Sequence, residues 1–314
     1  MNGIVITQQA QIQNNSTNLE NMLDSFIGFL DVSPNTVRSY SYGIRYFLRY
    51  VADNHITHPT RDTVIAYKTN LAAEKSAATV SLYLSAIRRF FAWTESAGLY
   101  QNITTGIKSP KISKTHRKDC FSGAQLKTII SGINRQSLEG KRNYAIFILA
   151  ACCGLRTIEI TRANIGDIHA VTGVALLDVM GKGHAEKNAF VKLPEPVMTA
   201  INDYLGMRGH VSNDEPLFTS CSRRNKGERL TTANISSVCK KAMRKAGFDS
   251  KRLTAHSLRH SAITLALLAG GKLDEVSAFA RHSSIAITQV YNHSVQRLKS
   301  ACENNVAGAI FYNW

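Results

Sequence analysis

The sequence has few acidic residues, no paired cysteine motif and no long apolar run. Aspartate and glutamate number 22 against 38 lysines and arginines, which leaves a formal net charge of +16. Such an excess favours a polyanionic partner such as nucleic acid. A basic surface that serves only solubility is the alternative.

The missing motifs exclude several protein classes. The 6 cysteines form no Cys-x-x-Cys pair, which disfavours a disulfide framework or a thiolate metal site and predicts reduced thiols in a cytoplasmic protein. The apolar run from Tyr144 to Leu155 is too short to cross a bilayer, so we expect no membrane partner. The N-terminus lacks a basic region followed by an apolar stretch, so we expect no secretion signal.

Length and charge distribution predict two domains. A chain of 314 residues that is 44% hydrophobic can bury a sizeable core. Residues 1–105 are nearly neutral, with 8 positive and 7 negative side chains, whereas residues 106–119 carry 5 and 1. We therefore predict the following segments: a flexible N-terminus (1–16), a helical domain (17–105), a basic linker (106–119), a second domain (120–305) and a C-terminal tail (306–314).

The linker is a candidate contact for nucleic acid. It contains Lys108, Lys111 and Lys114 and shows no helical periodicity. A cationic connector between two domains, each with a basic face, suggests that the protein closes around a DNA duplex. An ordinary flexible linker is the alternative.

The first domain is predicted to contain four helices, which begin near Thr17, Pro34, Arg61 and Ala77. The second helix places Arg38, Arg45 and Arg49 on one face, where they could follow a phosphate backbone. The fourth helix leaves polar and basic side chains outside, a composition that suits a major groove. These residues are Ser81, Ser85, Arg88 and Arg89. A solvated basic stripe is an equally good interpretation of the second helix.

The second domain is predicted to combine helices with a small sheet. An apolar helix from Arg142 is interrupted at Gly154, and Arg156 follows directly. An arginine beside a core needs a partner, and Glu159 lies three residues later. Two strands, 174–180 and 189–193, flank a turn in which Lys182 stands between glycines. The fold class is therefore mainly α with a small β-sheet.

A second set of polar residues follows towards the C-terminus. Thr254 is predicted to start a helix that carries His256 and Arg259 one turn apart, and His282 and Tyr291 come later. A phenol has a pKa of about 10 and attacks phosphate only with a neighbouring base and neutralised charge. Guanidinium groups match phosphate geometry. The combined order points to attack of a tyrosine on a DNA phosphodiester.

In this order the residues resemble the tyrosine recombinase, or phage integrase, family, over roughly residues 17–305. The resemblance implies a helical, SAM-like core-binding domain that precedes a mixed catalytic domain. It also implies that Arg156 and Arg259 bind the scissile phosphate and that Tyr291 attacks it to form a 3′-phosphotyrosyl link.

The resemblance implies roles for the remaining residues as well. Lys182 would protonate the leaving 5′-hydroxyl, His256 would assist proton transfer with the nucleophile, and His282 would bind a phosphate oxygen. Glu159 would support these groups without itself contacting the substrate. No metal and no cofactor are implied, because the phosphotyrosyl bond conserves the energy needed to rejoin the strands.

The sequence departs from the family pattern at three places. Arg281 stands before His282, where the family usually has glycine, and we predict that it adds a DNA contact. After the Gly-Lys-Gly turn, His184, Glu186 and Lys187 replace the usual further basic pair. The stretch before Thr17 is too short for an extra arm-binding domain, so we expect direct recognition of double-stranded core sites.

The family suggests an assembly and leaves the biological task open. An apolar C-terminal segment would be exchanged between protomers of a homotetramer on DNA that forms a Holliday junction, with possible accessory DNA-bending or directionality proteins in the bacterial nucleoid. Integration or excision of a mobile element is the first hypothesis, and Xer-like resolution of chromosome or plasmid dimers is the second. A type IB topoisomerase and a silent DNA-binding regulator are the rivals from other classes.

Overall fold

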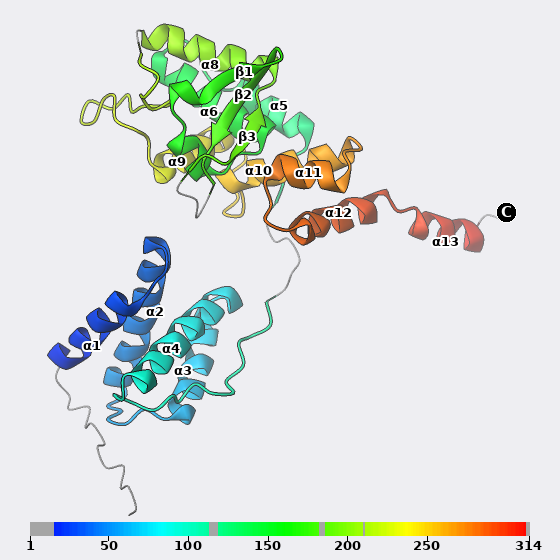
Figure 1. The fold of residues 1–314 in the computed structure, drawn as a ribbon. Helices are drawn as coiled ribbons and strands as arrows, with labels where there is room; N and C mark the ends of the chain where they lie inside the picture. The colour runs from blue at the N-terminus through cyan, green and yellow to red at the C-terminus, as the bar shows by residue number, and fades with distance from the viewer. Residues whose placement is uncertain (1–15, 113–118, 182–185, 210, 312–314) are drawn as a thin grey trace, which may run out of the picture. The chain divides into compact units, whose positions relative to one another are not determined.

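The computed structural model describes residues 16–112, 119–181, 186–209 and 211–311. Figure 1 shows a mainly helical chain with one small antiparallel sheet, which confirms the predicted fold class. The chain divides into two compact units, Met1–Ser113 and Lys114–Trp314.

Four helices form the described part of the first unit: α1 (Ser16–Phe29), α2 (Pro34–Asp53), α3 (Arg61–Glu74) and α4 (Ala77–Ser96). The sequence predicted each of them. Ser33 and Ser76 precede α2 and α4, and each side chain accepts a hydrogen bond from the backbone N–H three residues later. Such caps satisfy donors that the first turn of a helix leaves unpaired.

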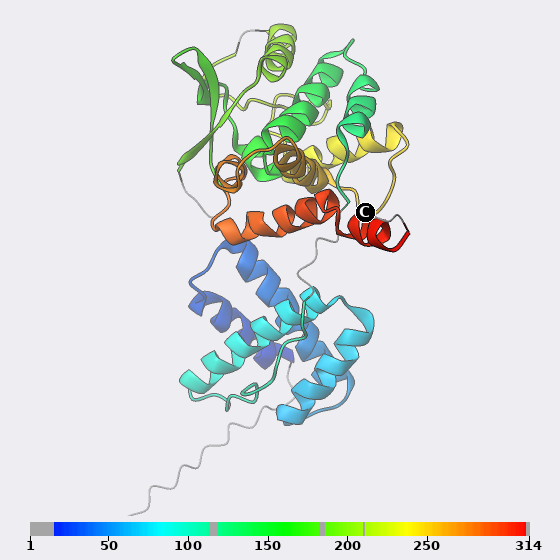
Figure 2. The same cartoon turned by 90° about the vertical axis from the view of Figure 1, so that its right-hand side faces the viewer.

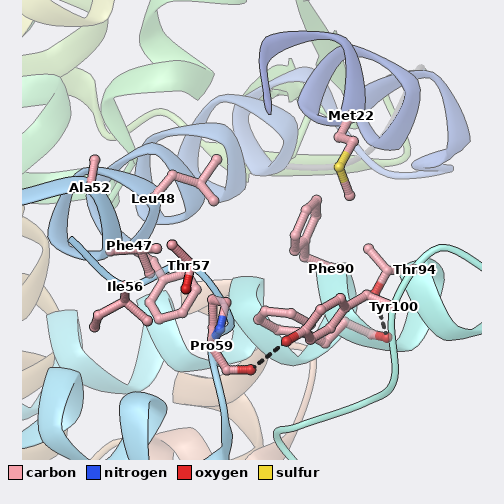
Figure 3. A pocket seen from close by; sticks show the side chains of 12 residues that line it. Met22, Phe47, Leu48, Ala52, Ile56, Thr57, Pro59, Phe90, Thr94 and Tyr100 are labelled. Atoms are coloured by element: carbon pink, nitrogen blue, oxygen red, sulfur yellow. Dashed lines mark hydrogen bonds between the residues drawn. The ribbon is translucent and has the colours of Figure 1, made fainter. Parts of the chain in front are cut away.

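Aromatic side chains fill the interior of the first unit. Phe47 on α2 lies edge-on to Tyr67 of α3 and to Phe91 of α4, with ring centroids 5.1 and 5.9 Å apart. A small apolar cavity remains beside Phe47, where Tyr100 donates a hydrogen bond to the Pro59 carbonyl at 2.7 Å (Figure 3). This packing fixes α2 and α4 against each other and leaves their outer faces to solvent.

The second unit is built around one buried helix, α6 (Leu138–Cys153). Its apolar run predicts this burial, and α8, α9 and α10 pack against it. The other elements are α5 (Gly123–Ser131), α7 (Thr157–Arg162), η1 (Ile165–Asp167), α8 (Glu195–Arg208), α9 (Thr232–Lys245), α10 (Ala255–Leu268), α11 (Leu273–Ala280), α12 (Ile285–Lys299) and α13 (Cys302–Phe311). Figure 2 shows the same helices from the side.

The sheet has the antiparallel order β1 (Ile168–Val171), β2 (Val174–Val179), β3 (Ala189–Lys192). The strand pair β2 and β3 was predicted. Strand β1 was not, because four residues, most of them exposed, carry too little alternation to mark a strand. Its pairing with β2, in which Ile168 lies opposite Leu177, is what defines it.

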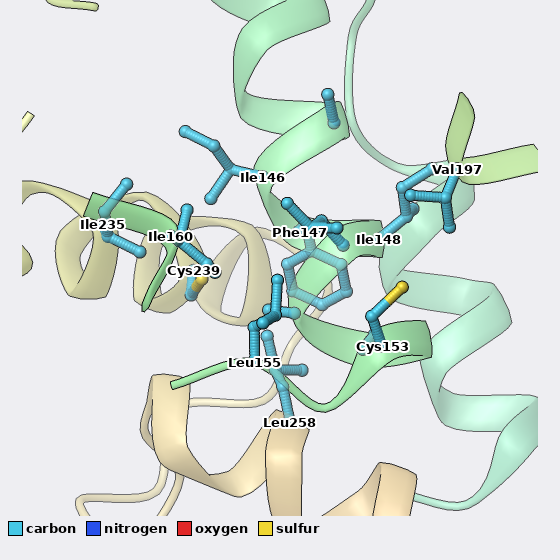
Figure 4. Close-up of a cluster of buried hydrophobic side chains, with 14 of the residues drawn as sticks. Ile146, Phe147, Ile148, Cys153, Leu155, Ile160, Val197, Ile235, Cys239 and Leu258 are labelled. Carbon is cyan, nitrogen blue, oxygen red and sulfur yellow. The ribbon is translucent and has the colours of Figure 1, made fainter. Parts of the chain in front are cut away.

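Side chains from α6 and its neighbours form a continuous apolar core (Figure 4). Phe147 and Leu155 lie at its centre, together with the thiols Cys153 and Cys239. Burial raises the pKa of both thiols to about 12. They therefore stay protonated at neutral pH and pack as small apolar groups.

The C-terminal apolar stripe is split between two helices. The first, α12, ends at Lys299, and the second, α13, begins at Cys302. On α13, Val306, Ile310 and Phe311 are 59, 67 and 76% exposed. An apolar face of this kind is costly to leave in water.

Candidate active site

Arg156 stands directly after the central helix of the second unit. Gly154 ends α6 with a left-handed conformation, φ 58°, and Arg156 then caps the start of α7. The Arg156 backbone N–H donates to Glu159 Oε2 at 2.8 Å, and its Nη1 donates to Oε1 at 2.8 Å. The Glu159 side chain is fully buried, so it holds both the backbone and the guanidinium of Arg156.

Arg259 reaches the same place from α10. Its Nη1 donates to the Gly154 carbonyl at 2.6 Å, and its Nη2 donates to the Ala280 carbonyl. Burial, together with Arg156 and Arg281, lowers the pKa of Arg259 to about 9. The group still carries its positive charge at neutral pH. Because Arg259 is only 2% exposed, these two carbonyls hold it in one orientation.

Arg281 points into the protein, which corrects the prediction that it contacts DNA. Its side chain is 9% exposed, and Nη2 donates to Glu159 Oε2 at 2.9 Å. Nη2 also donates to the Gly154 carbonyl at 3.2 Å, and Nη1 donates to the Phe279 carbonyl at 2.6 Å. The buried Glu159 carboxylate attracts this guanidinium away from the surface.

The end of α11 receives three guanidinium groups on consecutive carbonyls. Phe279 O accepts from Arg281, Ala280 O accepts from Arg259, and Arg281 O accepts from Arg156 Nη2 at 3.2 Å. The last carbonyls of a helix lack intrahelical partners and carry partial negative charge. This helix end therefore favours cations and places Arg156 and Arg259 near each other.

Tyr291 lies on α12 with its phenol in the interior. The side chain is 7% exposed, and its hydroxyl shares a hydrogen bond with His260 Nδ1. The two rings lie 5.2 Å apart between centroids, with an interplanar angle of 30°. His260 was not predicted as a site residue. The available signal was its place in the His256 to His260 stretch of α10, one turn after His256.

Burial raises the pKa of Tyr291 to about 12, and the charges of Arg259 and Arg156 act in the opposite direction. Both guanidinium groups are thus close enough to influence the phenol. Arg156 at the start of α7 therefore lies close to Arg259 of α10 and Tyr291 of α12, although it precedes both by more than a hundred positions in the sequence.

The two other predicted histidines flank this location. His256 is exposed and packs edge-on against His260, with ring centroids 4.5 Å apart. The His282 ring lies 6.1 Å from that of Tyr291, and its Nδ1 is 2.8 Å from the hydroxyl of the buried Thr288. The phenol is hydrogen-bonded to His260, whereas the sequence had pointed to His256 as the residue that assists it.

Lys182 and Lys114 lie outside the described residues. The strand pair that flanks Lys182 is present, and Arg162 Nη1 donates to the carbonyl of Gly181, its neighbour, at 3.0 Å. Lys187 forms an ion pair with Asp167. These contacts hold Gly181 and Lys187, the residues nearest to Lys182 that have a described partner.

The candidate DNA contacts of the first unit differ in exposure. The exposed ones are Arg38, Arg45, Arg49, Arg89, Lys108 and Lys111. Ser81 and Ser85 are half-buried, and the Ser85 hydroxyl donates to the Ser81 carbonyl at 2.8 Å. Arg88 donates to the Ile107 carbonyl at 2.6 Å. Arg88 thus holds the segment after α4, a correction to its prediction as an outward DNA contact.

The described part of the chain offers neither a metal cluster nor a membrane span. Within 16–112, 119–181, 186–209 and 211–311, no three His, Cys, Asp or Glu side chains gather as a metal site would require. No helix over those same ranges has the length and apolar character needed to cross a membrane.

Comparison with known families covers both units. Residues 120–297 match the phage integrase family, and residues 23–98 match the phage integrase N-terminal SAM-like domain. Tyrosine recombinase XerA of Pyrococcus furiosus is 29% identical over 287 residues, which cover 90% of this chain and 93% of the relative. A tyrosine recombinase of Synechococcus elongatus is 26% identical over 293 residues, covering 88% and 89%.

Solved structures share the fold. The XerH site-specific recombinase bound to palindromic difH substrate, in a post-cleavage complex, has a TM-score of 0.72 at 21% identity, with 92% of this chain and 84% of that chain covered. A lambda integrase dimer bound to a COC′ core site has a TM-score of 0.67 at 16% identity, with 86% and 96% covered. These likenesses establish the architecture of helical domain followed by mixed domain.

Replacement of Glu159 tests the electrostatic support of the site. Glu159→Gln keeps the shape but leaves Arg156 and Arg281 without their carboxylate, so we expect a loss of about 3–5 kcal/mol in the free energy of unfolding. Burial raises the pKa of Glu159, but Arg281 and Arg156 lower it below its ordinary 4.5. The difference is therefore full above about pH 4.5 and shrinks as the pH falls through the lower pKa of the folded protein.

Urea unfolding at several pH values measures this difference. Glu139→Gln is the matched control, because Glu139 is 63% exposed and also pairs with an arginine, Arg142. We expect the control to lose less than about 1 kcal/mol. Equal losses in the two variants would contradict a buried electrostatic support.

Proposed function

The chain belongs to the phage integrase family of tyrosine recombinases, and on that premise we propose that it is a site-specific DNA recombinase that cleaves and rejoins strands through Tyr291. The observation that carries the proposal is geometric: the Tyr291 phenol is hydrogen-bonded to His260, the neighbour of Arg259 on α10, while Arg259 and Arg156 bind adjacent carbonyls at the end of α11. A nucleophile beside two phosphate-binding forks is the arrangement that phosphoryl transfer requires.

The proposed reaction exchanges one phosphodiester for another. Arg156 and Arg259 bind the non-bridging oxygens of the scissile phosphate, and the Tyr291 oxygen attacks phosphorus. The bond from phosphorus to the 5′-oxygen breaks, which leaves a 3′-phosphotyrosyl link and a 5′-hydroxyl. Attack by a 5′-hydroxyl from a second duplex reverses the step and rejoins the strands. The number of phosphoester bonds is unchanged, so this sequence needs no high-energy cofactor.

Histidine and lysine side chains move the protons in this proposal. Tyr291 is protonated at neutral pH, and His260 Nδ1 is hydrogen-bonded to its hydroxyl, so His260 accepts the proton as the phenol attacks. His256 packs against His260 at the surface and assists this transfer. Lys182 protonates the leaving 5′-oxygen, and His282 binds a phosphate oxygen.

The proposed substrate is double-stranded DNA that both units bind, the first through the exposed arginines of α2. We propose a homotetramer that exchanges strands through a Holliday junction, as the solved lambda integrase tetramer bound to a Holliday junction supports. The exposed apolar side chains of α13 would then dock on a neighbouring protomer. Accessory DNA-bending or directionality proteins, and a place in the bacterial nucleoid, belong to the same proposal.

Two biological tasks fit this chemistry. Integration or excision of a mobile element has support from a structural neighbour, the Tn1549 transposon integrase in complex with transposon right end DNA. Resolution of chromosome or plasmid dimers has support from relatives named XerC and XerD. The position of the cleaved site distinguishes them, at the ends of an element that carries the gene or at one chromosomal site.

Tyr291→Phe tests the nucleophile. The protein is incubated without divalent metal with end-labelled DNA that carries the flanks of its gene, and the mixture is then denatured in detergent. We expect wild-type protein joined to a 3′ end and no adduct with Tyr291→Phe, because the variant lacks the attacking oxygen. DNA binding by the variant should be unchanged.

The control is Tyr144→Phe, which alters a tyrosine of the same unit that packs against Arg135. It should form the adduct normally. An adduct with Tyr291→Phe would exclude Tyr291 as the nucleophile. Specific binding by wild-type protein without any adduct would favour a silent regulator, and relaxation of any supercoiled plasmid without recombination would favour a type IB topoisomerase.

His260 is tested by two substitutions with different chemistry. His260→Asn keeps a polar atom near the position of Nδ1 but cannot accept a proton, whereas His260→Ala removes both functions. We expect both variants to cleave at least about 100-fold more slowly at saturating DNA, the usual range for loss of a general base. His293→Ala, an exposed histidine on the same helix as Tyr291, is the control. Wild-type cleavage by His260→Asn would limit His260 to orienting the phenol.

The exposed arginines of α2 are tested through salt dependence. Each phosphate that a cationic side chain neutralises contributes about 0.9 to the slope of log binding constant against log salt. Joint replacement of Arg38, Arg45 and Arg49 by alanine should therefore lower the slope by about 1 for every arginine that binds a phosphate in the wild type. Lys68→Ala on α3 is the control. An unchanged slope in the triple variant would identify the α2 stripe as solvated.

A further inference from the structure

We infer that Arg281 is a positioning residue for DNA cleavage, which holds Arg156 and Arg259 in the orientation that binds the scissile phosphate. The inference rests on the proposed function and deepens it. Arg281 directly precedes His282, and its side chain lies among the partners of Arg156 and Arg259.

The backbone of Arg281 is strained. It ends α11 in the left-handed region, with φ 52° and ψ 50°, a conformation that is unfavourable for a residue other than glycine. Its Nε is buried and has no partner among the described residues. A buried donor without a partner is also unfavourable. Arginine therefore stands here at the expense of stability, as residues at functional sites often do.

The side chain connects the two phosphate-binding arginines. Arg281 Nη2 binds Glu159 Oε2, while Arg156 Nη1 binds the other oxygen of the same carboxylate. Arg281 Nη2 also shares the Gly154 carbonyl with Arg259 Nη1. The Arg281 guanidinium thus contacts one hydrogen-bond partner of Arg156 and one hydrogen-bond partner of Arg259.

The backbone carbonyls of Ala280 and Arg281 also connect Arg156 and Arg259. The Arg281 carbonyl accepts from Arg156 Nη2 at 3.2 Å, and the preceding carbonyl, of Ala280, accepts from Arg259. A shift of this helix end would move both guanidinium groups together. Arg281 itself, with a side chain that is 9% exposed, acts through these neighbours rather than on the phosphate.

Arg281→Gly removes the side chain but allows the left-handed backbone conformation, so it tests the side chain alone. Glycine adopts the left-handed conformation without strain, but Glu159 loses one of its two guanidinium partners, so the fold should form with a lower melting temperature. We expect DNA affinity within about twofold of wild type but cleavage at saturating DNA slower by about 10- to 100-fold, because small misplacements of catalytic groups have effects of this size. Arg281→Lys keeps the positive charge but lacks the planar fork that spans the Phe279, Gly154 and Glu159 acceptors, so it should cleave at an intermediate rate.

His55→Gly is the matched control. His55 in the first unit has the same left-handed φ of 52° and is exposed, so this substitution relieves the same strain away from the site. Its cleavage rate should equal that of wild type. Wild-type cleavage by Arg281→Gly would overturn the inference, as would a loss of DNA affinity that accounts for the whole defect.

The positioning role of Arg281 can also be measured by spectroscopy, without an activity assay. In protein with isotope-labelled arginine, the guanidinium protons of Arg156 and Arg259 should exchange slowly in the wild type and faster in Arg281→Gly. If wild-type protein forms no DNA adduct, the proposed function fails, while this measurement still decides the positioning role. Unchanged exchange in Arg281→Gly would overturn that role.

Discussion

The ionised carboxylate of Glu159 is the charge on which the arrangement of the site depends. Burial alone would favour its protonated form, but Arg281 and Arg156 bind both of its oxygens and keep it charged. In return, the negative charge of Glu159 offsets the repulsion between the guanidinium groups of Arg281 and Arg156, which would otherwise move apart. With Arg259 close by, three cations are held next to a single buried anion.

Helix ends provide the remaining stabilisation. The carbonyls of Gly154 after α6 and of Ala280 and Arg281 at the end of α11 accept the guanidinium donors that Glu159 cannot. Because α6 is the buried centre of the second unit, the Gly154 carbonyl at its end is fixed by the core. The proposed phosphate site is therefore preorganised, which is the condition for electrostatic catalysis.

The proposed nucleophile is held differently from the cations. Tyr291 lies on α12, is mostly buried and is hydrogen-bonded to His260, with a pKa raised to about 12. The same burial that fixes the phenol also keeps it protonated, so the proposed attack depends on a neighbouring proton acceptor as much as on the two arginines. The structure thus places a cluster of fixed guanidinium groups near a phenol that is neutral at neutral pH.

The helices of the first unit, the strand pair and the order from Arg156 to Tyr291 could be predicted from sequence, because caps, periodicity and residue types act over a few positions. The inward direction of Arg281, the hydrogen bond of Arg88 to the segment after α4, the strand β1 and the pairing of His260 with Tyr291 emerged in the folded chain. Strand β1 is too short and exposed for a pattern, and the other three depend on a partner at least 19 positions away. A buried carboxylate or an unpaired carbonyl pairs with the donor that lies close to it in the folded chain. The local sequence pattern does not encode that proximity.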